Sequence, residues 1–481
     1  MDDKLEKDLL EAVGKSKKDI SIDNSFRDIA FDAENKRLGW VNASDFSQIK
    51  ESLEDISKLL EGKKYFIFVG MGGSINGIKP LISLFKADNF FTLDNLDPKA
   101  LSDIIDKIDD FENTLVVSIS KSGTTKETQL LSATLKEVFI EKLPARDWQE
   151  NFLWVSDLCS FSKLDSLGWT NVKKICIQFN KEFDIGGRFS SPQTMIFILP
   201  LYILLKKDFL KLKQVYGDFA GLLPKLRKVA LGLALDHING PNAYFSPLID
   251  SRLGESLSSW IVQLIQESLG SKQEGLQVKT IPNLEHDDLF MRVKPGLDID
   301  DPVVSLMSQM YFFQAYVAFY SAGKNVNFVT QNYVEKYKDK LRSLEGKSSI
   351  PVNEPASDFK TLFDYIDSKI KSEHRFIEIV LYFYPEQGLI DEFKENFSSR
   401  YKDKKIMLFL GSDWNHQSYQ AAFASSDTFF VLLTLANVKI HPPIDKTDIL
   451  KKNIDTLKLI AKATYLTIDD KSILLSIERD F

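Results

Sequence analysis

The sequence predicts an α/β protein built from two doubly wound parallel sheets with flanking helices. Short apolar runs rich in β-branched and aromatic residues alternate with helix-compatible segments, which is the rhythm of βαβ units. This rhythm runs from residue 65 to about residue 180 and resumes, more loosely, after residue 270. The chain has 481 residues, which is long for one hydrophobic core and favours two such units.

The composition narrows the classes of function. The net charge of −7 argues against a nucleic acid or an anionic membrane as the main partner. The two cysteines, Cys159 and Cys176, are too few for a disulfide framework and fit a reducing compartment. The charged start of the chain does not have the pattern of a signal peptide, and the longest apolar runs, near 195–205 and 429–438, are shorter than the ~18 residues of a membrane-spanning helix. We therefore expect a cytoplasmic protein that does not enter a membrane.

The first half of the chain is expected to carry one complete sheet. Residues 2–17 and 45–61 have the pattern of amphipathic helices. Apolar runs then predict strands at 65–69, 90–93, 115–118, 152–155 and 174–178. Helices are expected at 195–207 and 209–235, and a break near Asn239-Gly-Pro-Asn242 ends this half.

The second half repeats the pattern less regularly. A helix at 253–269 closes at Gly270, and the Ser-, Lys- and Glu-rich run 338–358 predicts an exposed connection. The remaining elements are expected as strands at 277–281, 327–330, 376–382, 405–410 and 429–434, and as helices at 302–323, 388–401 and 446–463. The chain then divides into an N-terminal helical segment at 1–45, a first sheet unit at 46–240, and a second unit at 241–481 with a C-terminal helix.

The strand at 65–69 ends in Gly70-Met-Gly-Gly-Ser74, a turn that suits a small oxyanion. Gly73 permits close backbone approach and the Ser74 hydroxyl can donate a hydrogen bond. A dinucleotide-binding turn is the alternative, with Asp94 as the ribose-binding acid. That pattern would require Gly where the chain has Ile75, so we favour the oxyanion.

The strand at 115–118 ends in a second loop of this kind, Ser118-Ile-Ser-Lys-Ser-Gly-Thr-Thr125. A capping box between Thr124 and Glu127 could explain part of it. Capping does not explain the remaining donors, and phosphate oxygens need several short donors that converge from one loop. We therefore predict a phosphate site made by Ser120, Lys121, Ser122 and Thr125.

Several segments resemble the glucose-6-phosphate isomerase family. They are Phe68-Val-Gly-Met-Gly-Gly-Ser, Leu93-Asp-Asn-Leu-Asp-Pro98, Ser118-Ile-Ser-Lys-Ser-Gly-Thr-Thr-Lys-Glu-Thr128 and Gly186-Gly-Arg-Phe-Ser190, in the order in which that family has them. Arg37-Leu-Gly-Trp40 resembles the isomerase half of fused transaldolase–isomerase proteins. The resemblance implies that the two sheet units are sugar-isomerase (SIS) subdomains.

The resemblance also implies catalytic roles. Glu267, in a segment like the family's Glu-Ser-Asn-Gly, would be the base, and Arg188 would lie beside the reacting carbons. Gln263, one helical turn before Glu267, is on the same face and could contact the substrate or Glu267. An ordinary solvated Glu and an Arg paired with a carboxylate are the structural alternatives.

Two further roles follow from weaker matches. Gly411-Ser-Asp-Trp-Asn-His-Gln-Ser-Tyr-Gln420 resembles the family's element whose His assists ring opening, which indicates His416. Trp414 replaces a Gly of that element. The family's late Lys, on a helix behind a turn that often contains Asp-Gln, is matched best by Lys451, with Lys452 as the rival.

The expected reaction is the interconversion of glucose 6-phosphate and fructose 6-phosphate through a cis-enediol. It needs no cofactor and no metal, and the resemblance implies a homodimer with the site near the subunit boundary. Two alternatives remain open at this point. The chain could act on mannose 6-phosphate or an amino-sugar phosphate, or it could be a sensor that binds a sugar phosphate without catalysis.

Overall fold

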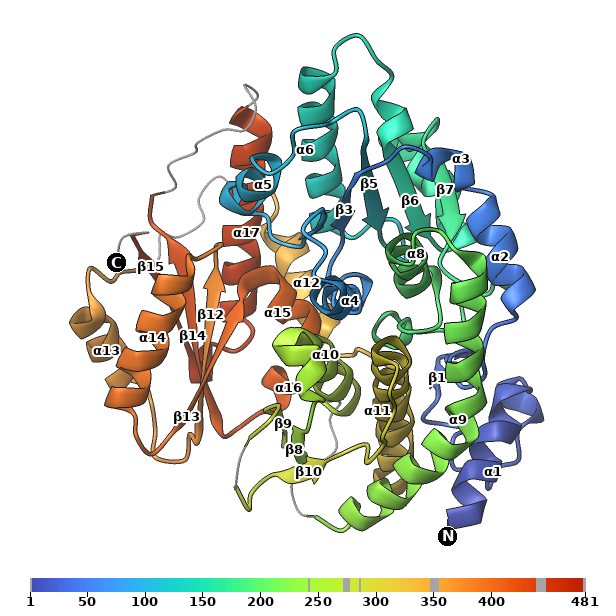
Figure 1. Cartoon of the computed structure of the whole chain (residues 1–481). Coiled ribbons are helices and arrows are strands. Elements are labelled where there is room, and N and C mark those ends of the chain that lie inside the picture. Colours follow the sequence, from blue (N-terminus) through green and yellow to red (C-terminus); the bar gives the residue numbers. More distant parts are fainter. Residues whose placement is uncertain are drawn as a thin grey trace.

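The computed structural model of the chain describes residues 2–240, 243–270, 277–284, 287–346, 354–437 and 447–478. It confirms the predicted fold class, because the described residues form two five-stranded sheets in which all neighbouring strands are parallel. Figure 1 shows the two sheets on opposite sides of a central group of helices that includes α4 (Lys79–Phe85), α12 (Val334–Leu344) and α15 (Gly411–Gln417).

The first sheet reverses its strand order at the point where the two oxyanion loops were predicted. Its strands lie in the order β4 (Phe90–Leu93), β3 (Tyr65–Val69), β5 (Thr114–Ile119), β6 (Phe152–Ser156) and β7 (Lys173–Cys176). These match the predicted strands to within two residues. In doubly wound sheets, ligands bind at the carboxyl ends of the strands on either side of the reversal. Here those strands are β3 and β5.

The second sheet has the same kind of reversal, between β12 and β14. Its strands lie in the order β11 (Glu354–Pro355), β15 (Ser472–Ile477), β14 (Thr428–Leu435), β12 (Phe376–Tyr382) and β13 (Lys405–Leu410). The predicted strands at 376–382, 405–410 and 429–434 are confirmed. The strands β11 and β15 were not predicted.

A third, three-stranded parallel sheet was also not predicted. It has the order β10 (Met291–Val293), β8 (Ala243–Pro247) and β9 (Val278–Thr280), and only β9 corresponds to an expected strand. A short antiparallel pair, β1 (Phe31–Asp32) and β2 (Asn35–Lys36), lies in the N-terminal segment.

Helices cover the sheets and fill the space between them. Those of the first 240 residues are α1 (Asp2–Val13), α2 (Phe46–Glu54), α3 (Ser57–Leu60), α5 (Pro98–Ile105), α6 (Lys126–Lys142), α7 (Phe161–Leu164), α8 (Met195–Leu204) and α9 (Phe209–His237). The later ones are α10 (Ser258–Leu269), α11 (Pro302–Lys324), α13 (Phe359–Asp367), α14 (Gln387–Arg400), α16 (Tyr419–Ala424) and α17 (Thr447–Tyr465).

Two predictions between α11 and the second sheet are wrong. Residues 327–330 form a loop rather than a strand, because the Asn327 side chain accepts hydrogen bonds from the amides of Val329 and Thr330. Residues 338–344 are the second half of α12 rather than an exposed connection, and α12 packs against α17. The helix buries Tyr337 and Leu341, one turn apart, so its apolar stripe is narrow.

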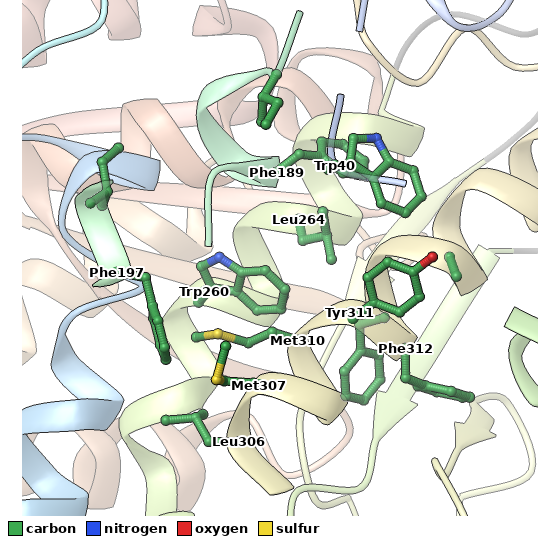
Figure 2. Close-up of a cluster of buried hydrophobic side chains, with 14 of the residues drawn as sticks. Trp40, Phe189, Phe197, Trp260, Leu264, Leu306, Met307, Met310, Tyr311 and Phe312 are labelled. Carbon is green, nitrogen blue, oxygen red and sulfur yellow. The ribbon is translucent and has the colours of Figure 1, made fainter. Parts of the chain in front are cut away.

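The largest core joins the N-terminal segment, the first sheet and the long helices. α11 is buried along nearly its whole length, as expected for a helix that is apolar on all sides. Figure 2 shows Trp260 of α10 facing Met307 and Met310 of α11, and Trp40 beside Phe189. This core continues across residue 240, from α9 into α10 and α11. The division at 1–45, 46–240 and 241–481 therefore stays a prediction.

Candidate active site

The loops that follow β3 and β5 line one pocket of about 780 Å³. Four of the predicted phosphate ligands, Ser74, Lys121, Ser122 and Thr125, lie in its wall, together with residues of the 157–166 segment. Ser120 is buried and its hydroxyl lies 3.0 Å from the Thr125 hydroxyl, so it supports the loop from behind. Thr125 immediately precedes the 17-residue helix α6, whose N-terminal amides and dipole favour an anion in the pocket.

Lys121 holds this loop to the segment that leads to Arg188. Its ammonium donates hydrogen bonds to the backbone carbonyls of Phe183 and Ile185. Burial, with a smaller contribution from the nearby charge of Arg37, lowers the pKa of Lys121 to about 8. The ammonium is therefore charged at neutral pH and close to its titration range.

The Asp94 carboxylate is already paired, so it is not available to bind a ribose hydroxyl. Its carboxylate lies 2.6 Å from the ammonium of Lys79, which also lies 3.9 Å from Asp413. Burial alone would lower the pKa of Lys79, but these two carboxylates outweigh it and raise that pKa to about 12. This pairing favours the phosphate reading over the dinucleotide reading.

Glu267 lies in the last turn of α10 with both carboxylate oxygens held by donors. Oε1 lies 3.3 Å from Nη1 of Arg188 and accepts a hydrogen bond from the side-chain amide of Gln331. Oε2 accepts a hydrogen bond of 2.9 Å from Nε2 of Gln263. Glu267 is 6% exposed, and the negative end of the helix dipole disfavours a carboxylate at this position. These donors compensate for both effects.

Arg188 is fixed by two other contacts. Its Nε donates to the Ser268 hydroxyl at 2.8 Å, and its Nη2 donates to the carbonyl of Phe328 at 2.6 Å. Burial lowers the pKa of Arg188 and the charge of Glu267 opposes that change. The guanidinium remains a cation at neutral pH, with a fixed direction relative to the Glu267 carboxylate.

Two glycines join the pocket to Glu267. A Cβ at Gly73 would collide with the carbonyl group of Gly187, so the first loop touches the backbone just before Arg188. Gly72 has φ of +52°, and a Cβ there would lie 2.8 Å from Nε2 of Gln263. Only glycine tolerates this close approach. Ser74 in the pocket wall is therefore separated from the Arg188–Glu267 pair by a single turn of backbone.

His416 lies against the same turn as Gln263, whose side-chain amide donates a hydrogen bond of 3.0 Å to the His416 carbonyl, and its ring pairs with Glu127. Its Nε2 is 3.1 Å from Oε1 of Glu127. Burial alone would lower the pKa of His416, but the hydrogen bond and charge of Glu127 outweigh it and raise that pKa above its ordinary value. Burial alone would raise the pKa of Glu127, and His416 reverses this and lowers it. The predicted capping box is wrong, because the N-cap of α6 is Thr125 and the Glu127 side chain pairs with His416.

The predicted Lys451 is exposed on α17, and among the described residues no contact joins it to Glu267, Arg188 or His416. The turn expected before it, at 441–445, lies outside the described residues. Lys338 on α12 is the lysine whose charge acts on both His416 and Glu127. It too lies on a helix behind a turn that contains a Gln, here Gln331. Its ammonium is 2.8 Å from Glu335.

Sequence reasoning thus missed several residues of this cluster, which are Glu127, Ser268, Phe328, Gln331, Lys338 and Asp413. Asp413 accepts a hydrogen bond of 3.2 Å from the Gly72 amide, which ties α15 to the first loop. Two of them could have been found from the sequence, since Glu127 follows the second phosphate loop closely and Gln331 precedes the polar helix α12. Among the described residues, no group of three His, Cys, Asp or Glu side chains could hold a metal ion.

Residues 48–213 match the family model for phosphoglucose isomerase. The resemblance to phosphoglucose isomerases is therefore confirmed. The matched part includes both pocket loops and Arg188 and ends before Glu267. In the part of the chain that is described, no helix combines the length and apolar character needed to cross a membrane.

Curated relatives extend this similarity. The chain is 28% identical over 275 residues to a glucose-6-phosphate isomerase of Thermus thermophilus, and the match covers 53% of this chain and 62% of the relative. It is 31% identical over 245 residues to that of Campylobacter jejuni, and this match covers 49% of this chain and 58% of the relative. The chain thus spans about six-tenths of the length of these relatives.

Two solved structures share the fold. A hypothetical protein of Thermus thermophilus has a TM-score of 0.50 at 22% identity, covering 71% of this chain and 95% of its own. A glucose-6-phosphate isomerase of Chlamydia trachomatis has a TM-score of 0.50 at 16% identity, covering 67% of this chain and 76% of its own.

Proposed function

We propose that the protein interconverts glucose 6-phosphate and fructose 6-phosphate. The observation that carries the proposal is the Arg188–Glu267 pair, which adjoins the Gly73 turn while the next residue, Ser74, lines the phosphate pocket. A sugar phosphate bound by Ser74, Ser122 and Thr125 would extend its first two carbons towards Glu267. The matched family and the relatives named above support this substrate.

In this mechanism Glu267 is the single base. It takes the proton from C2 of the opened aldose and returns it to C1 on the same face of the cis-enediol, so one carboxylate serves both steps. The hydroxyl proton of O2 passes to O1 by exchange with solvent water, which completes the ketose. The substrate's hydroxyl groups would replace part of the hydrogen bonding that Gln263 and Gln331 supply to Glu267 in the free protein. Arg188 would stabilise the negative charge that develops on the enediolate oxygen.

Ring opening is assigned to the His416–Glu127 pair. A protonated His416 can donate its proton to the ring oxygen while the hydroxyl at the anomeric carbon gives its proton to solvent water, so that the ring bond breaks as the carbonyl group forms. Because Lys338 is the lysine that acts electrostatically on this pair, we assign the supporting lysine role to Lys338 rather than to Lys451. The phosphate, held remote from these atoms, contributes binding energy that fixes C1 and C2.

The subunit arrangement and compartment are also proposals. The resemblance implies a homodimer, and the composition favours a cytoplasmic protein that binds neither nucleic acid nor membrane. Within one chain, however, His416 already reaches Glu127. The proposed site therefore needs no second subunit to supply its histidine.

A coupled assay tests the function against its alternatives. Purified wild-type protein is supplied with fructose 6-phosphate, mannose 6-phosphate or glucosamine 6-phosphate, and each product is measured. Turnover of fructose 6-phosphate to glucose 6-phosphate, lost in Glu267→Gln, supports the proposal. Turnover of only one of the other substrates would assign a different sugar phosphate. Sugar-phosphate binding without any turnover would assign a sensor.

A further inference from the structure

A buried ion pair joins the three-stranded sheet to the second five-stranded sheet, outside the site described above. Glu378 lies within β12, in which all the remaining residues are apolar or aromatic. Lys279 is on β9. The two side chains are ion-paired and each is only 1% exposed. The Lys279 ammonium also lies 5.3 Å from the centre of the Phe376 ring.

Trp414 contacts this ion pair through Glu378. Its indole Nε1 donates a hydrogen bond of 2.8 Å to Oε2 of Glu378, the oxygen distal to the lysine contact. Trp414 is fully buried and packs against the rings of Tyr419 and Phe430. Trp414 lies on α15, two residues before His416.

These three side chains connect the two catalytic helices. β9 is the next described strand after α10, which carries Glu267, and it packs against α10. Lys279 is thus on a strand that packs against the helix of Glu267, Glu378 lies in the second sheet, and Trp414 belongs to the helix of the proposed acid, His416. The network therefore joins β9, which packs against the helix of the proposed base, to the helix of the proposed acid.

Stability alone gives a poor reason for this arrangement. Burying two charges costs about as much as their attraction returns, and apolar replacements of such pairs are often neutral or stabilising. The helix α15 has only seven residues, too few to fix its own direction by helix propensity. It is anchored by Asp413 to the Gly72 amide and by Asn415 to Tyr382 and Thr464. Gln263 of α10 also donates a hydrogen bond of 3.0 Å to the carbonyl of His416. The hydrogen bond of Trp414 to Glu378 adds a further anchor, from β12.

We propose that Lys279, Glu378 and Trp414 form a positioning network that sets His416 relative to Glu267. This inference rests on the proposed isomerase function. The position of His416 depends on the Glu378 oxygen that accepts the hydrogen bond of the Trp414 indole. Lys279 balances the charge of that buried carboxylate.

Two double variants separate the acceptor from the charge. Lys279→Met with Glu378→Gln removes both charges but keeps a carbonyl oxygen for Trp414. Lys279→Met with Glu378→Leu removes both charges and the acceptor. Because both variants remove the two charges of the pair together, both are expected to fold, which thermal unfolding checks.

The kinetic readout is the interconversion of the two hexose phosphates. We expect the variant with Glu378→Gln to keep kcat within about threefold of wild type. The variant with Glu378→Leu should lose about tenfold or more in kcat while its KM stays within about twofold, because only the transition-state geometry changes. Equal kcat values in the two variants would overturn the inference. Failure of the wild type to turn over would contradict the proposed function instead.

A second readout does not depend on activity. The ring protons of His416, assigned by their loss in His416→Asn, are titrated by NMR in each variant. In the Leu variant, we expect the titration midpoint to fall towards the ordinary histidine value, because the contact with Glu127 loosens. An unchanged midpoint would overturn the inference.

Trp414→Phe completes the test, with Trp154→Phe as its control. Trp154 is also fully buried, on β6, but its indole nitrogen has no hydrogen-bond partner among the described residues. Both changes remove the same ring volume. A loss of kcat confined to Trp414→Phe supports the network, whereas an equal loss in both variants would assign the effect to general destabilisation.

Discussion

Nε2 of His416 lies 3.1 Å from Oε1 of Glu127, although α15 packs against the second sheet and α6 against the first. Glu127 raises the pKa of His416 above its ordinary value, against the effect of burial. The pair therefore favours the imidazolium form of His416, which is the form that a ring-opening acid requires.

Replacing Glu127 by Gln tests this pair. The amide keeps the shape of the side chain but removes the charge, so the pKa of His416 falls and the protonated acid is lost at lower pH. We expect the high-pH limb of the kcat profile to move to lower pH and kcat at pH 8 to fall about tenfold. A profile that superimposes on that of the wild type would exclude Glu127 from this role.

Anion binding is predicted to depend on the protonation of Lys121. Its pKa is about 8, so the ammonium is charged below this pH and loses its charge as pH rises through it. We expect the affinity for sulfate, which remains a dianion across this range, to fall between pH 7 and pH 9. Isothermal titration measures this, and the control is Lys121→Met, for which the pH dependence should disappear. The same decline in both proteins would contradict the assignment.

A matched pair of lysine variants decides which lysine supports ring opening. Lys338→Met removes a positive charge that lowers the pKa of His416. The protonated His416 is then a weaker acid, so kcat should fall by about tenfold. Lys451→Met changes an exposed side chain and should keep kcat within about twofold. The reverse result would return the role to Lys451, where the sequence resemblance placed it.

The turn that joins the pocket to the base should not tolerate a methyl group. In Gly73→Ala the new Cβ would meet the backbone of Gly187 and Arg188, and neither can move without shifting the guanidinium. We expect a loss of about 1–3 kcal/mol in the free energy of unfolding and a fall in kcat. Gly217→Ala in α9, where a Cβ meets nothing within 4 Å, is the control for both measurements. Near-wild-type kcat in Gly73→Ala would contradict the described contact.

Local sequence signals were sufficient for the first sheet and its loops. A buried strand that ends in glycine and hydroxyl residues has few alternative structures, so β3, β5 and the pocket residues Ser74, Ser122 and Thr125 could be placed. Glu267 was indicated by the resemblance of its segment to the Glu-Ser-Asn-Gly segment of the isomerase family.

Long-range pairing explains the residues that could not be found. From the sequence, Thr124 is the nearest capping-box partner of Glu127. Only the fold shows that Glu127 pairs with His416 instead. The polar run that contains Lys338 has few apolar residues, so from the sequence it looks like an exposed connection. It is a helix in the structure because those few apolar residues pack against α17. Gln331 reaches Glu267 from a loop whose apolar pattern resembles a strand, since side-chain hydrogen bonds of Asn327 shape that loop.

The most direct test of the account is isomerisation in deuterium oxide, followed by NMR, with wild-type protein and Glu267→Gln. A single general base that shares its proton with solvent predicts deuterium at C2 of the glucose 6-phosphate formed from fructose 6-phosphate. We expect the wild type to give this product and Glu267→Gln to be slower by at least about 100-fold, with sulfate binding unchanged. Isomerisation by Glu267→Gln at a rate close to that of the wild type would contradict the central claim that Glu267 transfers the proton.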